Sequence, residues 1–394
     1  MLLRALLNGL LPALLPACSD YTRILDLSIS RSLDLFLWQV GERATQKALW
    51  SMIGREPQRF VSGLTSDEPS FTRLFTHETW RAYTGRPILT RWLVILRTWR
   101  YSTVLRAVYP VSALASIWAY AVASLPRALL PRTSPVPMSL MGTALGLLLV
   151  FRTNNSYLRL AEARALWSTM LCAVRALAQG VATALLWDER HAKSEEARDS
   201  AARVCRYLAC FAWELRARLM GGQAADNASA SIRNALLSPE EASFVGGCRL
   251  RPATIVGAIR RELHDQYTRS WLDAHIHRRL EEHVGELERV VSSCERIFSS
   301  PLPPTLSRHI VRCLQLWLIG FPFVLAGTMA PLSVALWVFA TSYAFVGIDD
   351  AGQQVEQPFD LMPMNKLCLF ATQTLDETFV RMPPGMRERQ QQQS

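Results

Sequence analysis

The chain has 394 residues and a net charge of +10, and half of its residues are hydrophobic. A mean hydropathy of +0.10 together with 12 Trp argues against an ordinary soluble enzyme and indicates segments that span a membrane. The positive charge fits nucleic acid, an anionic lipid surface or an anionic permeant. The eight Cys show no paired spacing, which argues against a zinc site or a disulfide framework.

Residues 1–80 are interpreted as an N-terminal extension that carries a targeting sequence. The run MLLRALLNGLLPALLPA has one Arg followed by many Leu, which is typical of a signal peptide or an import presequence. Pro12 and Pro16 interrupt the run, so it is a poor membrane span. Asp20, Asp26 and Asp34 argue against a simple transit peptide, because such peptides contain few acids.

Residues 81–151 are predicted to form an interfacial helix followed by two membrane helices. The basic, aromatic segment from Arg86 to Arg106 is typical of a helix at headgroup depth. A hydrophobic segment follows at once, which argues against nucleic-acid binding. Ala107–Leu125 is uncharged and long enough for one span. Met138–Phe151 covers only about 21 Å of helix, short of a hydrocarbon core of about 30 Å, which favours a helix buried within an oligomer.

The stretch Met138–Trp167 changes character at Phe151-Arg152, where an apolar half gives way to a charged amphipathic half. We expect one continuous helix that leaves the membrane and enters water. Thr143, Leu147 and Phe151 recur every four residues on one face of it. Two interpretations fit this spacing: stacked rings around a pore, where an apolar ring gates by dewetting, or packing against neighbouring spans.

Residues 152–310 are predicted to form a soluble helical domain. Tyr157–Ala184 and Ala197–Met220 have helical amphipathic patterns, Gly221–Pro239 has the composition of a loop, and Pro252–Phe298 is a long charged helical stretch. Asp273, His277 and Glu281 share one helix face and allow a metal site. A solvated face with charge pairs at i, i+4 explains the same spacing, so no metal is expected.

Residues 311–348 are predicted to form two more spans, and residues 349–394 a C-terminal tail. Leu314–Ile348 has no charge and is broken by Gly327 and Pro331, which indicates a tight turn. Arg residues flank the spans so that the N-terminus, the domain 152–310 and the tail lie on one side of the membrane. The sequence therefore predicts an all-α integral membrane protein with four transmembrane helices and a large helical cytosolic or stromal domain.

The segment FRTNNSYLRLAEARALW resembles the block F-R-x-N-x-S-Y-x-R-x-x-E-x-R-x-x-W of the bestrophin family of anion channels. The segments LWLIGFPFVLAG and GIDDAGQQVEQPFDLMP resemble the family's third span and post-membrane segment, as found in bacterial, plant and algal members. The matching motif residues are Arg152, Asn154, Asn155, Tyr157, Arg159, Glu162, Arg164 and Trp167 at the pore mouth, and Asp349, Asp350, Glu356, Pro358 and Phe359 after the membrane.

This resemblance implies a homopentamer that conducts chloride, and also bicarbonate, through an apolar neck of Thr143, Leu147 and Phe151. Thr143 stands where the family has a bulky apolar residue, which predicts a more easily wetted neck. Arg152 and Arg159 are expected either to concentrate anions or to pair with Glu162 in helix packing, and the packing role is favoured. The two Asn and Tyr157 are expected to supply interhelical hydrogen bonds or to donate to a dehydrating anion.

The acidic run of the calcium clasp of animal members is missing after Phe359, so no cofactor is expected and calcium gating is doubted. Two other functions remain open: a non-conducting membrane scaffold that binds a soluble partner, and a helical membrane enzyme that uses the His275–His283 region. No catalytic motif supports an enzyme. The expected partners are anions, membrane lipids and further copies of the chain, without nucleic acid. The expected location is the chloroplast thylakoid membrane, with the plasma membrane as the alternative.

Overall fold

The computed structural model describes residues 87–377 except 100–101, 132–133, 189 and 191–193, and also His77, Arg81, Thr84 and Gly85. The expected N-terminal extension, residues 1–80, lies outside the described residues except for His77. The last part of the expected tail, residues 378–394, lies outside them as well.

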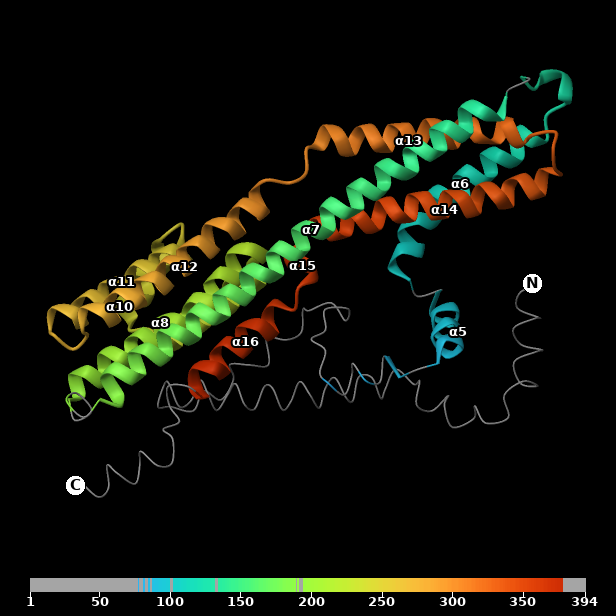
Figure 1. The fold of residues 1–394 in the computed structure, drawn as a ribbon. Coiled ribbons are helices and arrows are strands. Elements are labelled where there is room, and N and C mark those ends of the chain that lie inside the picture. The colour runs from blue at the N-terminus through green and yellow to red at the C-terminus, as the bar shows by residue number, and fades with distance from the viewer. Residues whose placement is uncertain are drawn as a thin grey trace.

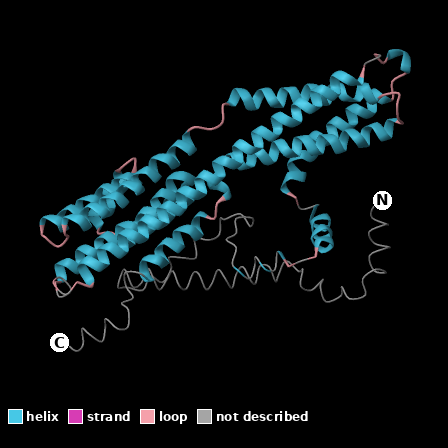
Figure 2. Cartoon of the chain, in the orientation of Figure 1, coloured by secondary structure: helices cyan, strands magenta, loops and turns pink. Residues whose placement is uncertain are grey.

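Helices make up the described chain, and no β-strand occurs in it (Figure 2). The prediction of an all-α fold is confirmed. A 3₁₀ turn, η2, spans Arg127–Leu129, and a π-helical turn, η3, spans Ala182–Leu186. The helices are α5 (Ile88–Thr98), α6 (Thr103–Ala123), α7 (Pro135–Val181), α8 (Glu195–Met220), α9 (Gln223–Leu236), α10 (Pro239–Gly247), α11 (Arg251–Thr268), α12 (Ala274–Ser299), α13 (Pro304–Leu325), α14 (Pro331–Glu356), α15 (Pro358–Leu361) and α16 (Met364–Leu375).

The helix α7 runs along most of the molecule and belongs to both of its halves (Figure 1). Its 47 residues correspond to about 70 Å at 1.5 Å per residue. Prolines occur only in its first turn, where they do not interrupt backbone hydrogen bonding. The predicted continuous helix across Phe151-Arg152 is therefore confirmed.

At one end of the molecule, α7 packs against α13 and α14, and these two helices pack in turn against α6 (Figure 1). Four helical segments of the described chain are long and apolar enough to cross a membrane: Val104–Ala123, Pro135–Leu186, Ala274–Leu325 and Pro331–Glu356. The predicted number of spans is confirmed by length and composition. The predicted turn between the last two is also confirmed, because α13 ends at Leu325 and α14 begins at Pro331. Gly327 in this turn has a φ of 84°, which favours glycine.

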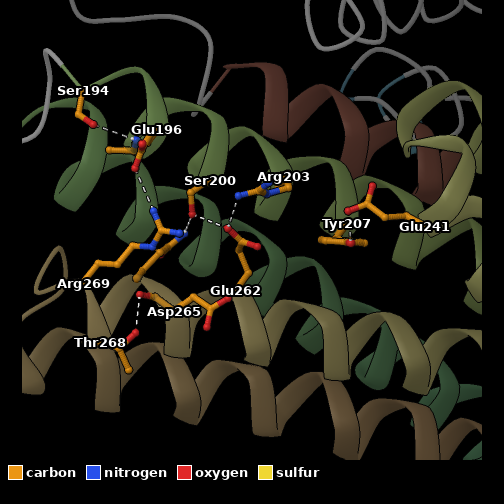
Figure 3. Close-up of polar contacts among 12 residues, drawn as sticks. Ser194, Glu196, Ser200, Arg203, Tyr207, Glu241, Glu262, Asp265, Thr268 and Arg269 are labelled. Carbon is orange, nitrogen blue, oxygen red and sulfur yellow. Dashed lines mark hydrogen bonds and ion pairs between the residues drawn. The ribbon is translucent and has the colours of Figure 1, made fainter.

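At the other end, α8, α11, α12 and α16 pack with α7 around one hydrophobic core. Trp167, Phe211 and Trp213 are its largest fully buried side chains. Polar contacts join α8 to α11, where Ser200 donates to Glu262 at 2.6 Å and Arg203 pairs with the same carboxylate at 3.1 Å (Figure 3). These contacts fix the angle between two helices whose apolar faces meet in the core.

One expectation for the soluble half is wrong. Residues 223–236, expected to be a loop, form α9, because Ala225, Ser229, Ile232 and Leu236 follow a helical spacing and are buried. The small polar residues between them face water. The stretch from Pro252 to Phe298, predicted to be helical, forms two helices, α11 and α12, and the chain turns between them, where Ser270 has a φ of 60°.

A buried ionic cluster ties α8 to α9 and α11. The side chain of Glu214 is fully buried and pairs with Arg233 and Arg251, and Arg251 also pairs with Asp226. Removing one partner of a buried pair leaves a desolvated charge without compensation. We therefore expect Glu214→Ala to lower the free energy of unfolding by about 3–5 kcal/mol in chemical denaturation of the detergent-solubilised protein.

The matched control is Glu282→Ala, which removes an exposed carboxylate 3.7 Å from Arg278. Exposed pairs contribute at most about 1 kcal/mol, so this variant should unfold close to the wild type. Equal losses in the two variants would contradict a structural role for the buried cluster.

Candidate functional site

One face of α7 is left uncovered by the rest of the described chain. Thr143, Leu147 and Phe151 lie on this face, and the side chains of Leu147 and Phe151 are each 56% exposed. The spacing of four residues predicted that they share a face, and the structure places them there. The Thr143 hydroxyl donates to the carbonyl of Ser139 at 3.0 Å, so its hydrogen is already used by the helix. We call this exposed face of α7 the α7 stripe.

The opposite face of α7 anchors the helix where it leaves the apolar segment. Arg152 is 5% exposed and forms an ion pair with Asp349 of α14. Beside this pair, a Cβ placed on Gly352 would lie 3.8 Å from the backbone of Thr153, an ordinary contact distance, so α7 and α14 pack directly against each other here. The pair neutralises the charge next to Phe151 and holds α7 against α14.

Two turns further along, Arg159 binds backbone carbonyls at the ends of two helices. Its guanidinium donates to Ile297 at 2.6 Å and Ser300 at 2.7 Å, where α12 ends, and to Glu356 at 3.4 Å, where α14 ends. Carbonyls at a helix C-terminus have no hydrogen-bond donor within the helix, and the helix dipole gives this end a partial negative charge. A guanidinium supplies both the donors and the opposite charge. Arg159 therefore joins α7, α12 and α14 without a carboxylate.

The expected pairing of Arg152 or Arg159 with Glu162 is wrong. Glu162 forms its ion pair with Arg296 of α12 instead. Of the remaining motif residues, Arg164 is exposed, and Trp167 is buried in the core of the soluble half. Pairing within α7 was expected, whereas α14 and α12, which are distant in sequence, supply the partners.

Asn154, Asn155 and Tyr157 lie on the exposed side of α7 just beyond Phe151. Within the described chain they have no hydrogen-bond partner, so the expected interhelical hydrogen bonds are not made inside one copy. Their amide and phenol groups remain able to bind water, an anion or a second copy of the chain.

The acidic residues near the end of α14 are engaged by protein groups. Asp350 accepts from Gln354 at 2.7 Å, and the Glu356 carboxylate accepts from the Leu302 backbone N–H at 3.2 Å. Pro358 and Phe359 begin α15 and are buried. These contacts use side chains that a calcium ion would need, and the described residues contain no group of three or more His, Cys, Asp or Glu placed to hold a metal.

The His275–His283 region is likewise engaged by contacts to α11 and within α12. The ring of His277 stacks on Tyr267 with centroids 4.7 Å apart, Glu281 pairs with Arg260, and His283 contacts Glu286. On the face expected to hold Asp273, His277 and Glu281, the last two residues therefore contact α11, whereas Asp273 is exposed and lies 3.9 Å from Arg190.

Comparisons with known proteins agree with this architecture. Residues 83–377 match the family model described as bacterial/fungal bestrophin protein. The chain belongs to the bestrophin family. A chloroplastic voltage-dependent chloride channel of Arabidopsis thaliana is 26% identical over 62% of this chain, and this match spans only 56% of the relative's length. A voltage-dependent anion channel-forming protein of Ralstonia nicotianae is 30% identical over 57% of this chain and 70% of its own.

A solved structure shares the fold of this bestrophin. The crystal structure of a bacterial bestrophin homologue from Klebsiella pneumoniae superposes with a TM-score of 0.62 at 25% identity, covering 71% of this chain and all of the other. The residues of this chain outside the matched segment belong mainly to the region before residue 83.

The buried ion pair between Arg152 and Asp349, on the face of α7 opposite the α7 stripe, allows a prediction. Asp349→Ala leaves the Arg152 guanidinium buried without a counter-charge, and we expect a loss of about 3–5 kcal/mol in unfolding free energy. Asp350→Ala is the matched control, because its carboxylate is adjacent but only accepts from Gln354. A comparison of unfolding in detergent checks both variants, and an unaffected Asp349→Ala protein would show that the pair does not hold α7 to α14.

Proposed function

We propose that this bestrophin is an anion channel in which copies of the α7 stripe surround the ion path. The observation that carries the proposal is the uncovered row of Thr143, Leu147 and Phe151 on a helix that passes from an apolar segment into a soluble domain. A helix of this kind must be covered by lipid or by further copies. A ring of copies, which the family assignment favours as a pentamer, turns the row into stacked rings.

The stripe has the chemistry of a gate that excludes water when it is narrow. Leu147 and Phe151 form apolar rings, and an apolar constriction closes by dewetting without a moving plug. Thr143 adds a polar oxygen at the first ring, so this ring wets more easily than the others. A short dewetted segment gives a barrier that small movements of α7 change strongly.

The charges near the stripe favour anions without trapping them. Arg152 is neutralised by Asp349, so no unpaired charge lies directly behind Phe151. Arg159 binds carbonyls and keeps its net charge beyond the narrow part, where it raises the local anion concentration. The exposed amide of Asn154 follows Phe151 on the same stripe and offers N–H groups to an anion that loses water.

The relatives named as chloride and anion channels support chloride as the main permeant, and bicarbonate is the second expected anion. The proposed setting is the chloroplast thylakoid membrane, supported by the chloroplastic relatives from Arabidopsis thaliana, with the plasma membrane as the alternative. In this proposal the chain performs no chemical reaction and requires no cofactor.

Chloride current through the purified chain in planar bilayers tests the proposal. We expect anion-selective current in the wild type and a several-fold larger current in Phe151→Ala, because the variant widens and wets the narrowest apolar ring. Leu114→Ala is the control, since Leu114 is an equally apolar exposed residue on α6, away from the stripe. If well-folded oligomers of the wild type and of both variants carried no chloride current, this would contradict the channel and favour the non-conducting scaffold.

A second substitution tests the wetting of the first ring. Thr143→Val keeps the shape of the side chain but removes its oxygen, so we expect a smaller chloride current at unchanged selectivity. Thr169→Val is the control, because Thr169 donates to its own helix in the same way but lies in the soluble half. Equal currents in wild type and Thr143→Val would contradict a role of the hydroxyl in wetting.

A further inference from the structure

A groove of about 510 Å³ lies between α7 and α13 in the membrane half. Its volume falls in the range of about 300–1,000 Å³ that is usual for small-molecule sites. It is lined mainly by Met138, Ser139, Thr143, Trp317, Phe321 and Val324. These residues belong to the first turns of α7 and the last turns of α13, at the end of the molecule away from the soluble half (Figure 1).

The walls of the groove offer hydrocarbon contact and little hydrogen bonding. The indole N–H of Trp317 donates to the Met138 carbonyl at 3.0 Å, and the Thr143 hydroxyl donates to Ser139. The Trp317 ring stacks on Phe321 with centroids 4.4 Å apart. A polar ligand would find few free donors here, whereas an alkyl chain would lie against aromatic and aliphatic side chains.

The end of the groove near the loops carries positive charge. Arg127 in the connection before α7 donates to the carbonyl of Gly327 at 2.9 Å, and Gly327 follows two residues after Leu325, which lines the groove. The sequence has no Asp or Glu between Glu78 and Glu162 or between Glu295 and Asp349. No carboxylate in these segments opposes the charge of Arg127, so an anionic headgroup is favoured at this end.

We propose that this groove binds an acyl chain of an anionic phospholipid whose phosphate pairs with Arg127. The groove supplies the apolar contact, and the guanidinium, held in place by Gly327, supplies the charge. Thr143 lines the groove and also belongs to the α7 stripe. A bound chain therefore packs against the first ring of the proposed neck and limits how far it can move. Lipid binding itself does not depend on conduction.

The test is native mass spectrometry of the full chain released from nanodiscs that contain phosphatidylglycerol and phosphatidylcholine in equal amounts. The wild type is expected to retain phosphatidylglycerol in preference to phosphatidylcholine. Arg127→Gln should lower that preference about fivefold, the effect of one arginine near an anionic surface. Ser139→Phe fills the groove and should remove retained lipid of both kinds.

Arg312→Gln is the matched control, because Arg312 is an exposed arginine on α13 that lies 13 residues before Leu325, about 20 Å along the helix from the Arg127 end of the groove. It should retain lipid as the wild type does. Equal retention in wild type and Ser139→Phe would overturn the site. So would a Ser139→Phe protein that keeps its lipid but dissociates into single chains, because a second copy would then occupy the groove. A protein that retains lipid normally but carries no anion current would contradict only the proposed channel function and not the lipid site.

Discussion

The structure depends on the buried ion pair between Arg152 and Asp349. It lies where α7 leaves its apolar segment, at the point where two helices from distant parts of the sequence must meet. Burying both charges costs solvation free energy, which the pair recovers only while its geometry is kept. Beside the pair, Gly352 of α14 lies against Thr153 of α7, so the two helices are in direct contact at this level. The pair thus makes the position of Phe151 a consequence of where α14 lies.

The continuity of α7 extends this constraint to the whole molecule. The C-terminal part of α7 contributes its buried face to the core of the soluble half, and the N-terminal part packs against the other membrane spans. Arg159 adds a second connection, because it binds the carbonyl ends of α12 and α14 together. A displacement of α12 would therefore be transmitted to α7 within one or two turns of the stripe.

The sequence predicted the parts of this arrangement that follow from local periodicity. The change from apolar to charged residues at Phe151-Arg152 gave one helix through both environments, and the uncharged stretch broken at Gly327 gave two spans. The prediction of a loop at α9 was wrong because the many small polar residues of this segment have the composition of a loop. The segment is helical because Ile232 and Leu236 are buried on one face of it. The partners of Arg152 and Glu162 were also missed, because helix spacing offers local carboxylates and says nothing of helices distant in sequence.

The α7 stripe continues past the membrane half, and this sets a limit on what can cover it. Beyond Phe151 the stripe includes Leu158, whose side chain is 56% exposed, and then Ala161 and Ala165. Hydrocarbon can cover the stripe up to Phe151, but it cannot follow α7 into water, where exposed apolar surface is unfavourable. Leu158 lies on the same helix face as Leu147, so whatever covers one is positioned to cover the other. A neighbouring copy can cover the stripe in both environments, whereas lipid around a lone chain covers it only in the first.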